Sequence, residues 1–239
     1  MSQVETLERA FPTAVSLPRY VERTRRVLRA HGFTARNSLP LLGACRDELS
    51  VGIFTEVNAR WGAPFELMTV AGLPTYGRTA LGAAAQHIPD SDGPPRMVAI
   101  LTTHIGIDRE GRIGWCGRPG QSEPTTACGA LAVFRGELAA GRRDTRFDPS
   151  DVEMSLLRAR LLPMIPEGEV PAFEDLTRTV RDVIATDFPP ALAPVLKGTG
   201  TLLAVFTGIV VHGSHGRDWV EPGSAVLYAP GETVGRELD

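Results

Sequence analysis

The stretch Met97-Val-Ala-Ile-Leu-Thr-Thr-His-Ile-Gly-Ile107 is the clearest β-strand signal in the chain. It consists almost wholly of apolar and β-branched residues, which favours a buried strand, and it carries His104 near its carboxyl end. The run from Ser38 to Cys45 has the same apolar character and ends in a cysteine. We therefore predict two buried strands, each with a potential metal ligand near its carboxyl end.

Helical patterns alternate with these strands. Leu49 to Arg60 places apolar residues on one face, which predicts a half-buried helix shortly after Cys45. Strands that alternate with helices indicate an α/β fold with a mostly parallel sheet covered by helices. We expect one domain over residues 1–239, with an N-terminal helical arm over about residues 1–36. The other predicted elements are helices over Pro18–Ala30, Thr79–His87, Ala127–Ala140 and Ala172–Thr186, a helix from Ser150 with Glu153 at capping-box spacing, and strands over Phe65–Leu73, Leu202–His212 and Ser224–Tyr228.

The composition is that of an ordinary water-soluble globular protein. Of the 239 residues 43% are hydrophobic, and 25 basic against 28 acidic residues leave a net charge of −3. This balance predicts no nucleic-acid partner and no anionic membrane partner. The amino terminus has no secretory signal pattern, and the longest apolar stretch, Leu202 to Val211, has about half of the ~20 residues that span a bilayer. We expect a soluble, cytoplasmic protein.

Three side chains are candidate metal ligands. In an open α/β sheet, ligands bind beyond the carboxyl ends of the strands, where Cys45 and His104 are expected. Cys128 falls in the first turn of a predicted helix, directly after a loop rich in Gly and Pro. Two thiolates, one imidazole and an open fourth position form a catalytic zinc shell. The spacing carries no CxxC signature, so buried cysteines and a core histidine that serve only packing remain the alternative.

Charged residues follow Cys45 at once, in the sequence Cys45-Arg46-Asp47-Glu48. A carboxylate two residues after a metal-bound thiolate can accept a hydrogen bond from a metal-bound hydroxide, and an adjacent arginine can keep that carboxylate ionised. The alternative is structural, with Asp47 as a helix cap and Arg46 as a surface charge.

Six short motifs resemble, in order, those of the limiting-CO2-inducible protein B (LCIB) family, an outlying branch of the β-type carbonic anhydrases. The resemblance runs from about Leu41 to Leu138. The motifs are Cys45-Arg-Asp-Glu48, Gly72-Leu-Pro74 with Gly77-Arg-Thr79, Gln86-His-Ile-Pro-Asp90, Thr103-His-Ile-Gly-Ile107, Gly117-Arg-Pro-Gly-Gln121 and Ala127-Cys-Gly-Ala130.

The resemblance implies a fold like that of β-carbonic anhydrases, a homodimer, and Zn²⁺ bound by Cys45, His104 and Cys128. It also implies that Asp47 pairs with an arginine. Ordinary β-carbonic anhydrases carry that arginine two residues after the aspartate, where this chain has Leu49, so Arg46 is our first choice and Arg78 the reserve. The motif around His87 suggests a group that passes protons to solvent, with a helix-end cap as the alternative reading of this residue.

The predicted function is the zinc-dependent, reversible hydration of CO2 to bicarbonate by a metal-bound hydroxide that the Asp-Arg pair orients. Two alternatives stay open. In a thiol enzyme, Cys128 would be the nucleophile and His104 its base. In a catalytically silent zinc-containing subunit, the same fold would bind bicarbonate or serve as a scaffold. Some members of the family that this chain resembles lack activity.

Overall fold

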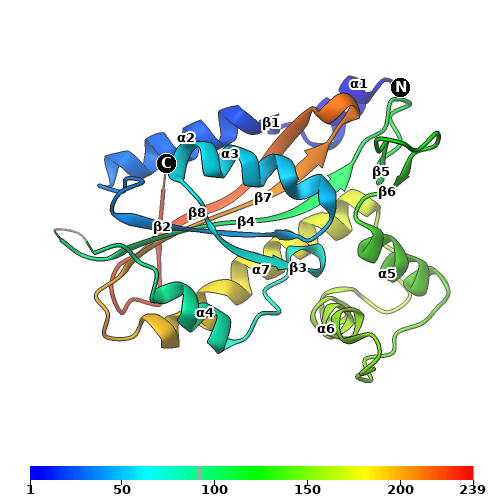
Figure 1. The fold of residues 1–239 in the computed structure, drawn as a ribbon. Coiled ribbons are helices and arrows are strands. Elements are labelled where there is room, and N and C mark those ends of the chain that lie inside the picture. Colours follow the sequence, from blue (N-terminus) through cyan, green and yellow to red (C-terminus); the bar gives the residue numbers. More distant parts are fainter. Residues whose placement is uncertain (91–92, 239) are drawn as a thin grey trace.

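A mixed β-sheet forms the centre of the molecule (Figure 1). In the computed structural model, which describes residues 1–90 and 93–238, seven strands have the order β1-β8-β7-β4-β2-β3, with β9 paired to β8. The strands are β1 (Val15–Ser16), β2 (Ser38–Cys45), β3 (Phe65–Thr69), β4 (Arg96–Gly106), β7 (Leu202–His212), β8 (Asp218–Tyr228) and β9 (Arg236–Glu237).

Four neighbouring strands run parallel. β2 pairs in parallel with β3 and β4, and β4 pairs in parallel with β7, whereas β8 runs antiparallel to β7. Every residue of β2 and ten of the eleven residues of β4 and of β7 are buried. Their apolar character reflects this burial on both faces. The predicted α/β class with a mostly parallel sheet is confirmed.

Helices cover both faces of the sheet (Figure 1). One face carries α2 (Leu17–Ala30) and α3 (Val51–Trp61), which pack on even-numbered strand residues such as Leu42 and Val98. The other face carries α4 (Arg78–Ala85), α5 (Gly129–Ala139), α6 (Val152–Leu161) and α7 (Phe173–Leu196), which pack on odd-numbered residues such as Leu41 and Leu101. This alternation follows from the two-residue period of a strand.

The predicted N-terminal arm contains more than helices. It holds α1 (Gln3–Ala10), the short β1 and α2, and the side chain of Leu7 packs with Phe11 against Ile105 and Val211. The arm therefore contributes to the core at the carboxyl ends of β4 and β7.

Two predicted helix boundaries need correction. The helix expected to end at Thr186 continues as α7 to Leu196, because the buried side chains of Phe188 and Leu192 anchor a segment that contains three prolines. The cap of α6 is Asp151 rather than Ser150, since the Asp151 carboxylate accepts a hydrogen bond from the Met154 N–H at 3.4 Å. Local sequence signals indicated a helix end near Thr186 and a helix start near Ser150, but tertiary contacts determine where these helices end and begin.

A tight turn after β3 packs against β4 just before His104. It is a short 3-10 segment, Val70–Gly72. Gly72 has a φ of +79°, and a Cβ added there would lie 2.1 Å from the carbonyl oxygen of Thr102. A side chain cannot fit in this position, so glycine allows the turn to approach the end of β4 closely.

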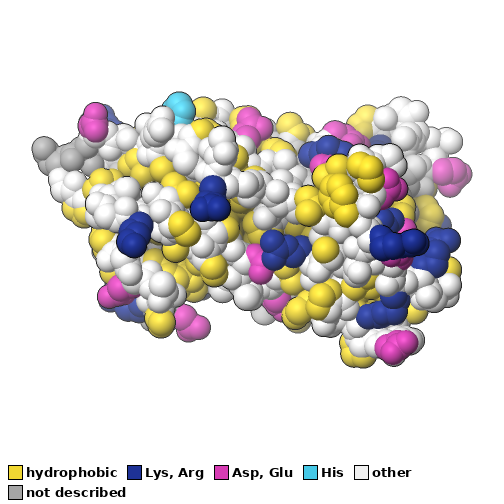
Figure 2. Space-filling model, turned by 90° about the horizontal axis from the view of Figure 1, so that it is seen from below, with side chains coloured by type: hydrophobic (Ala, Val, Ile, Leu, Met, Phe, Trp, Pro, Cys, Tyr) yellow, Lys and Arg dark blue, Asp and Glu magenta, His cyan; other side chains and the backbone are white. Residues whose placement is uncertain are grey.

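The face that carries α4 and α6 shows apolar side chains interspersed with charged ones (Figure 2). Among the exposed large apolar residues of the chain are Val133, Phe147, Val152 and Met164, which come from α5, α6 and the segments beside them. Within the described residues, no helix has the length and apolar character needed to cross a membrane.

Candidate metal centre

The structure brings the three predicted ligands together. Cys45 is the last residue of β2, His104 lies near the end of β4, and Cys128 directly precedes α5. Their ligand atoms all lie within 4.8 Å of one another, and the two sulfur atoms are 3.8 Å apart. All three side chains are buried.

The free atoms at this centre fit a metal ion. The Nε2 atom of His104 is buried and has no hydrogen-bond partner, which is costly for a polar atom unless something binds it. Two sulfurs and one imidazole nitrogen form a donor set that suits zinc and leaves a fourth position open. Cys45, His104 and Cys128 can therefore hold a metal ion.

The two thiols are electrostatically coupled. The pKa of Cys45 is lowered to about 4, first because the Cys128 thiol donates a hydrogen bond to its sulfur, and further because the Asp47 N–H does so. The pKa of Cys128 is raised well above its usual value by the hydrogen bond with Cys45 and by burial. The pair therefore holds one thiolate and one thiol at neutral pH, and a bound metal would displace the second proton.

His104 belongs to a chain of three side chains that the sequence did not reveal. Its Nδ1 lies 3.1 Å from Nε2 of His212, and Nδ1 of His212 lies 3.0 Å from Oδ1 of Asp218. The two imidazole rings meet edge to face, with centroids 5.2 Å apart. Burial lowers the pKa of His212, which favours its neutral form. His212 ends β7 and Asp218 begins β8, directly opposite each other in the sheet.

Asp47 has an arginine partner, and it is Arg118. Nη2 of Arg118 lies 3.0 Å from Oδ2 and 3.3 Å from Oδ1 of Asp47. The same guanidinium bonds the carboxylate of Glu48 and the hydroxyl of Thr125. Asp47 also caps the following turn, because its Oδ1 accepts the Leu49 N–H at 3.1 Å. Asp47 thus both caps this turn and forms an ion pair with an arginine.

The structure does not pair Asp47 with either arginine that the sequence suggested. Arg46 points to Glu153, with which it forms an ion pair, and its side chain is 64% exposed. Successive residues after a strand point in different directions, so adjacency to Asp47 did not give Arg46 access to it. Arg78, the reserve, is exposed at the start of α4. A signal for Arg118 existed in the motif Gly117-Arg-Pro-Gly-Gln121, but the course of a loop cannot be deduced from periodicity.

His87 lies away from the metal centre. It follows α4 and packs against Phe65, with ring centroids 5.7 Å apart. Phe65 begins β3, whereas Cys45 is paired with Thr69 at the other end of that strand. Four strand residues correspond to about 13 Å. Within one chain, the structure does not bring His87 to the three ligands.

Cys116 stays outside the ligand cluster. It is a buried residue of the two-residue strand β5 (Trp115–Cys116), which pairs with β6 (Thr125–Thr126). Burial raises the pKa of its thiol. Its burial in β5 indicates a packing role.

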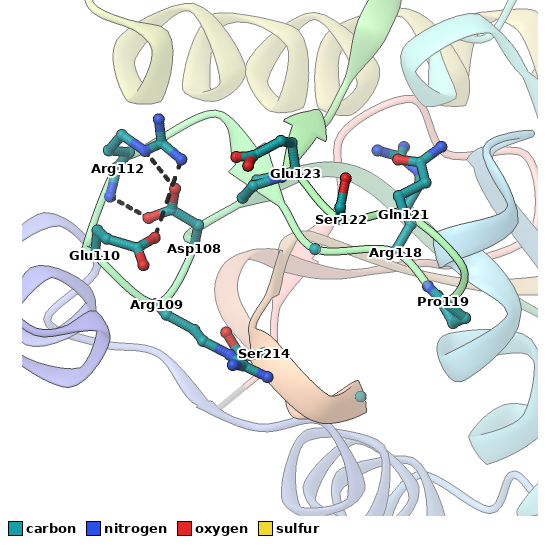
Figure 3. Close-up of a pocket in the computed structure, with 13 residues that line it drawn as sticks. Asp108, Arg109, Glu110, Arg112, Arg118, Pro119, Gln121, Ser122, Glu123 and Ser214 are labelled. Atoms are coloured by element: carbon teal, nitrogen blue, oxygen red, sulfur yellow. Dashed lines mark hydrogen bonds and ion pairs between the residues drawn. The ribbon is translucent and has the colours of Figure 1, made fainter.

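A pocket of about 880 Å³ lies beside Arg118 (Figure 3), and none of the three ligand residues lines it. Arg118 and Gln121 form part of its wall, and Arg109 and Ser214 also line it. Asp108 closes the turn at its edge by accepting hydrogen bonds from the backbone N–H and the Nε of Arg112, at 2.8 and 2.5 Å. Arg118 is thus shared between the pocket and Asp47.

Comparison with known proteins gives the family. The family described as limiting CO2-inducible proteins B/C beta carbonic anhydrases matches residues 14–229. The chain belongs to this family. Two solved structures share its fold: PtLCIB4, a homolog of the limiting CO2-inducible protein LCIB (TM-score 0.82, 21% identity, 98% of this chain and 99% of that chain covered), and LCIB itself (TM-score 0.80, 21% identity, 98% and 97% covered). Among curated proteins, no sequence matches.

Proposed function

We propose that this chain is a zinc-dependent carbonic anhydrase that reversibly hydrates CO2 to bicarbonate. The observation that carries the proposal is the buried group of two sulfurs and an unpartnered imidazole nitrogen, and Asp47, two residues after Cys45, is held by an arginine. Membership of the family supports the same function.

Zinc, when bound by Cys45, His104 and Cys128, would lower the pKa of a bound water from 15.7 to about 7 and so supply a nucleophile for CO2 at neutral pH. The chain keeps Asp47 next to this position, because the Asp47 N–H bonds the Cys45 sulfur. The Asp47 carboxylate can accept a hydrogen bond from the attacking water and direct its lone pair toward the substrate. Arg118 holds that carboxylate in place through both oxygens.

Arg118 would provide a positive charge for the anionic product, bicarbonate. Arg118 bonds Asp47 and also lines the pocket, so a bicarbonate that leaves on this side would meet a cation. Solvent in the pocket can also take up the proton that hydration releases. We assign no transfer step to His87, because this residue lies beside Phe65.

The thiol-enzyme alternative is disfavoured by burial. The hydrogen bond with Cys45 and burial raise the pKa of Cys128, which makes it the poorer nucleophile of the pair. The silent-subunit alternative has the same geometry as the enzyme and differs only in turnover.

We further propose a homodimer in the cytoplasm. The family resemblance supports the dimer, and light scattering of the purified protein at several concentrations tests it. All three cysteines of the chain are free, and a zinc site needs Cys45 and Cys128 as reduced thiols. Both points support a reducing compartment. Localisation of a fluorescent fusion tests the compartment.

The deciding experiment combines zinc analysis with stopped-flow CO2 hydration. We expect about one zinc per chain and turnover that Asp47→Asn reduces on the order of 10²-fold while zinc is retained. Asp182→Asn, on an exposed part of α7, is the matched control and should behave as wild type. Stoichiometric zinc without any turnover would support the silent subunit, and absence of zinc would overturn the proposed function.

A further inference from the structure

A buried chain of hydrogen bonds leads from the metal centre across three strands. It joins Nδ1 of His104 on β4 to Nε2 of His212 on β7, and Nδ1 of His212 to Oδ1 of Asp218 on β8. His104 and His212 are 1% and 2% exposed, and the Asp218 side chain is 13% exposed. Such a chain has few competing water contacts, so its hydrogen bonds define its geometry.

The register of the sheet creates this contact. His212 is paired with Gly106 on β4, two residues beyond His104 and on the same face of that strand. Diagonal neighbours of this kind lie within reach of long side chains. Asp218 is directly opposite His212 across the β7–β8 pair.

The direction of these hydrogen bonds follows from Asp218, the last residue in the series. A carboxylate can only accept, so an ionised Asp218 requires a proton on Nδ1 of the neutral His212. The Nε2 of His212 then has a lone pair and accepts from Nδ1–H of His104. This leaves a lone pair on Nε2 of His104, the atom that has no partner and belongs to the ligand cluster.

The position of Asp218 is itself constrained by α3. A Cβ added at Gly52 would lie 2.5 Å from Oδ2 of Asp218, so a larger residue at this position would displace the carboxylate. Gly52 is the second residue of α3, and the positive end of a helix dipole favours an ionised carboxylate nearby. The first turn of α3 therefore supports Asp218 as an acceptor.

We propose that His212 and Asp218 are positioning residues that hold His104 in the tautomer with its proton on Nδ1 and aim its Nε2 lone pair at the metal. The consequence for zinc affinity rests on the proposed function, whereas the tautomer does not. Neither residue touches the reacting atoms, and both act through His104.

Zinc affinity, measured by competition with a chromophoric chelator, tests the consequence. We expect His212→Phe, which keeps a ring of similar size but cannot accept, to weaken binding about 10- to 100-fold. His212→Gln should recover part of the loss, because its amide can accept from His104 and donate to Asp218. Gly52→Ala should weaken binding in the same direction without altering either polar residue.

His31→Phe is the control for replacing a histidine by phenylalanine, since His31 ends α2 and contacts Arg236 rather than this chain of side chains. Its zinc affinity should equal that of wild type. Wild-type affinity in both His212→Phe and Gly52→Ala would overturn the proposed positioning role. A loss that His212→Gln does not relieve would also contradict it, since that pattern is expected of a purely structural residue.

The tautomer is read directly in the metal-free wild-type protein by ¹⁵N NMR of the histidine rings. We expect a proton on Nδ1 and a bare Nε2 in both His104 and His212, which a merely structural packing of the rings would not require. A proton on Nε2 of His104 would overturn the proposal even if zinc binds. If zinc does not bind at all, the proposed function fails, and this spectrum still decides the role of His212 and Asp218.

Discussion

Arg118 holds Asp47 by both carboxylate oxygens, at 3.0 and 3.3 Å from one guanidinium nitrogen. The side chains are 13% and 14% exposed, so water competes little for either group. The pair joins the loop before α5 to the turn after β2, and the backbone N–H of Asp47 bonds the sulfur of Cys45.

Arg118→Lys should reduce kcat by roughly tenfold or more with zinc content unchanged, because lysine keeps the charge but loses the planar group that fixes the carboxylate. Stopped-flow hydration and metal analysis of the same sample check this. Arg46→Lys and Arg78→Lys are matched controls and should retain wild-type kcat, since Arg46 pairs with Glu153 and Arg78 is exposed. A large loss in Arg46→Lys and none in Arg118→Lys would show that the ion pair seen here is not the functional one.

Replacement of any one ligand by alanine should abolish stoichiometric zinc, because each supplies one of three converging atoms. Cys116→Ser should retain zinc, since Cys116 lies in β5 outside the cluster, and this variant controls for the loss of a thiol. Metal analysis after dialysis measures both. Full zinc content in Cys128→Ala would contradict the ligand assignment.

His87→Ala should change kcat by no more than about twofold in a well-buffered assay, because the ring packs on Phe65 at the far end of β3. The measurement is CO2 hydration at high and low buffer concentration. A loss of tenfold that added imidazole buffer restores would show that His87 does transfer the proton, through an arrangement of chains that one chain does not display.

Glu137 of α5 and Arg158 of α6 form a bidentate ion pair. Nε and Nη2 of Arg158 donate to the two carboxylate oxygens of Glu137, at 2.8 and 2.6 Å. The hydrogen bonds from Arg158 lower the pKa of Glu137 below its usual value. A folded-state pKa below the unfolded value of about 4.3 means stability that is present above that pH and is lost as the pH falls through the folded-state pKa. Glu137→Gln should therefore lower the free energy of unfolding by about 1 kcal/mol at pH 7 and by progressively less below pH ~4.

Urea unfolding at several pH values measures this effect, with the exposed Glu232→Gln as the control. An equal loss of stability at pH 7 and pH 3 would exclude the ion pair as its cause.

Sequence patterns predicted the buried strands well. The bounds of β2 and β7 agree with the predicted runs Ser38–Cys45 and Leu202–His212, because strands buried on both faces are continuous apolar segments with clear ends. The end of α7 was missed because Pro189 and Pro190 locally oppose a helix that burial of Phe188 maintains.

The candidate site was predicted in its ligands but not in their partners. Cys45 and His104 were visible as reactive residues at strand ends, where topology requires convergence. Arg118 lies in an irregular loop, and His212 meets His104 only because β7 lies beside β4. The order of strands in a sheet is a tertiary property, so the sequence pattern alone contains no signal for this contact.

The position of these residues along the chain sets the moment at which the ion can be acquired. Cys45 is synthesised before Cys128, and the His212–Asp218 support of His104 follows after both. When Cys128 has left the ribosome, the nascent chain still lacks β7, the parallel neighbour of β4. On the proposed positioning role of His212 and Asp218, high-affinity metal capture awaits the synthesis of β7 and β8, and a chain truncated before β7 should bind the ion more weakly.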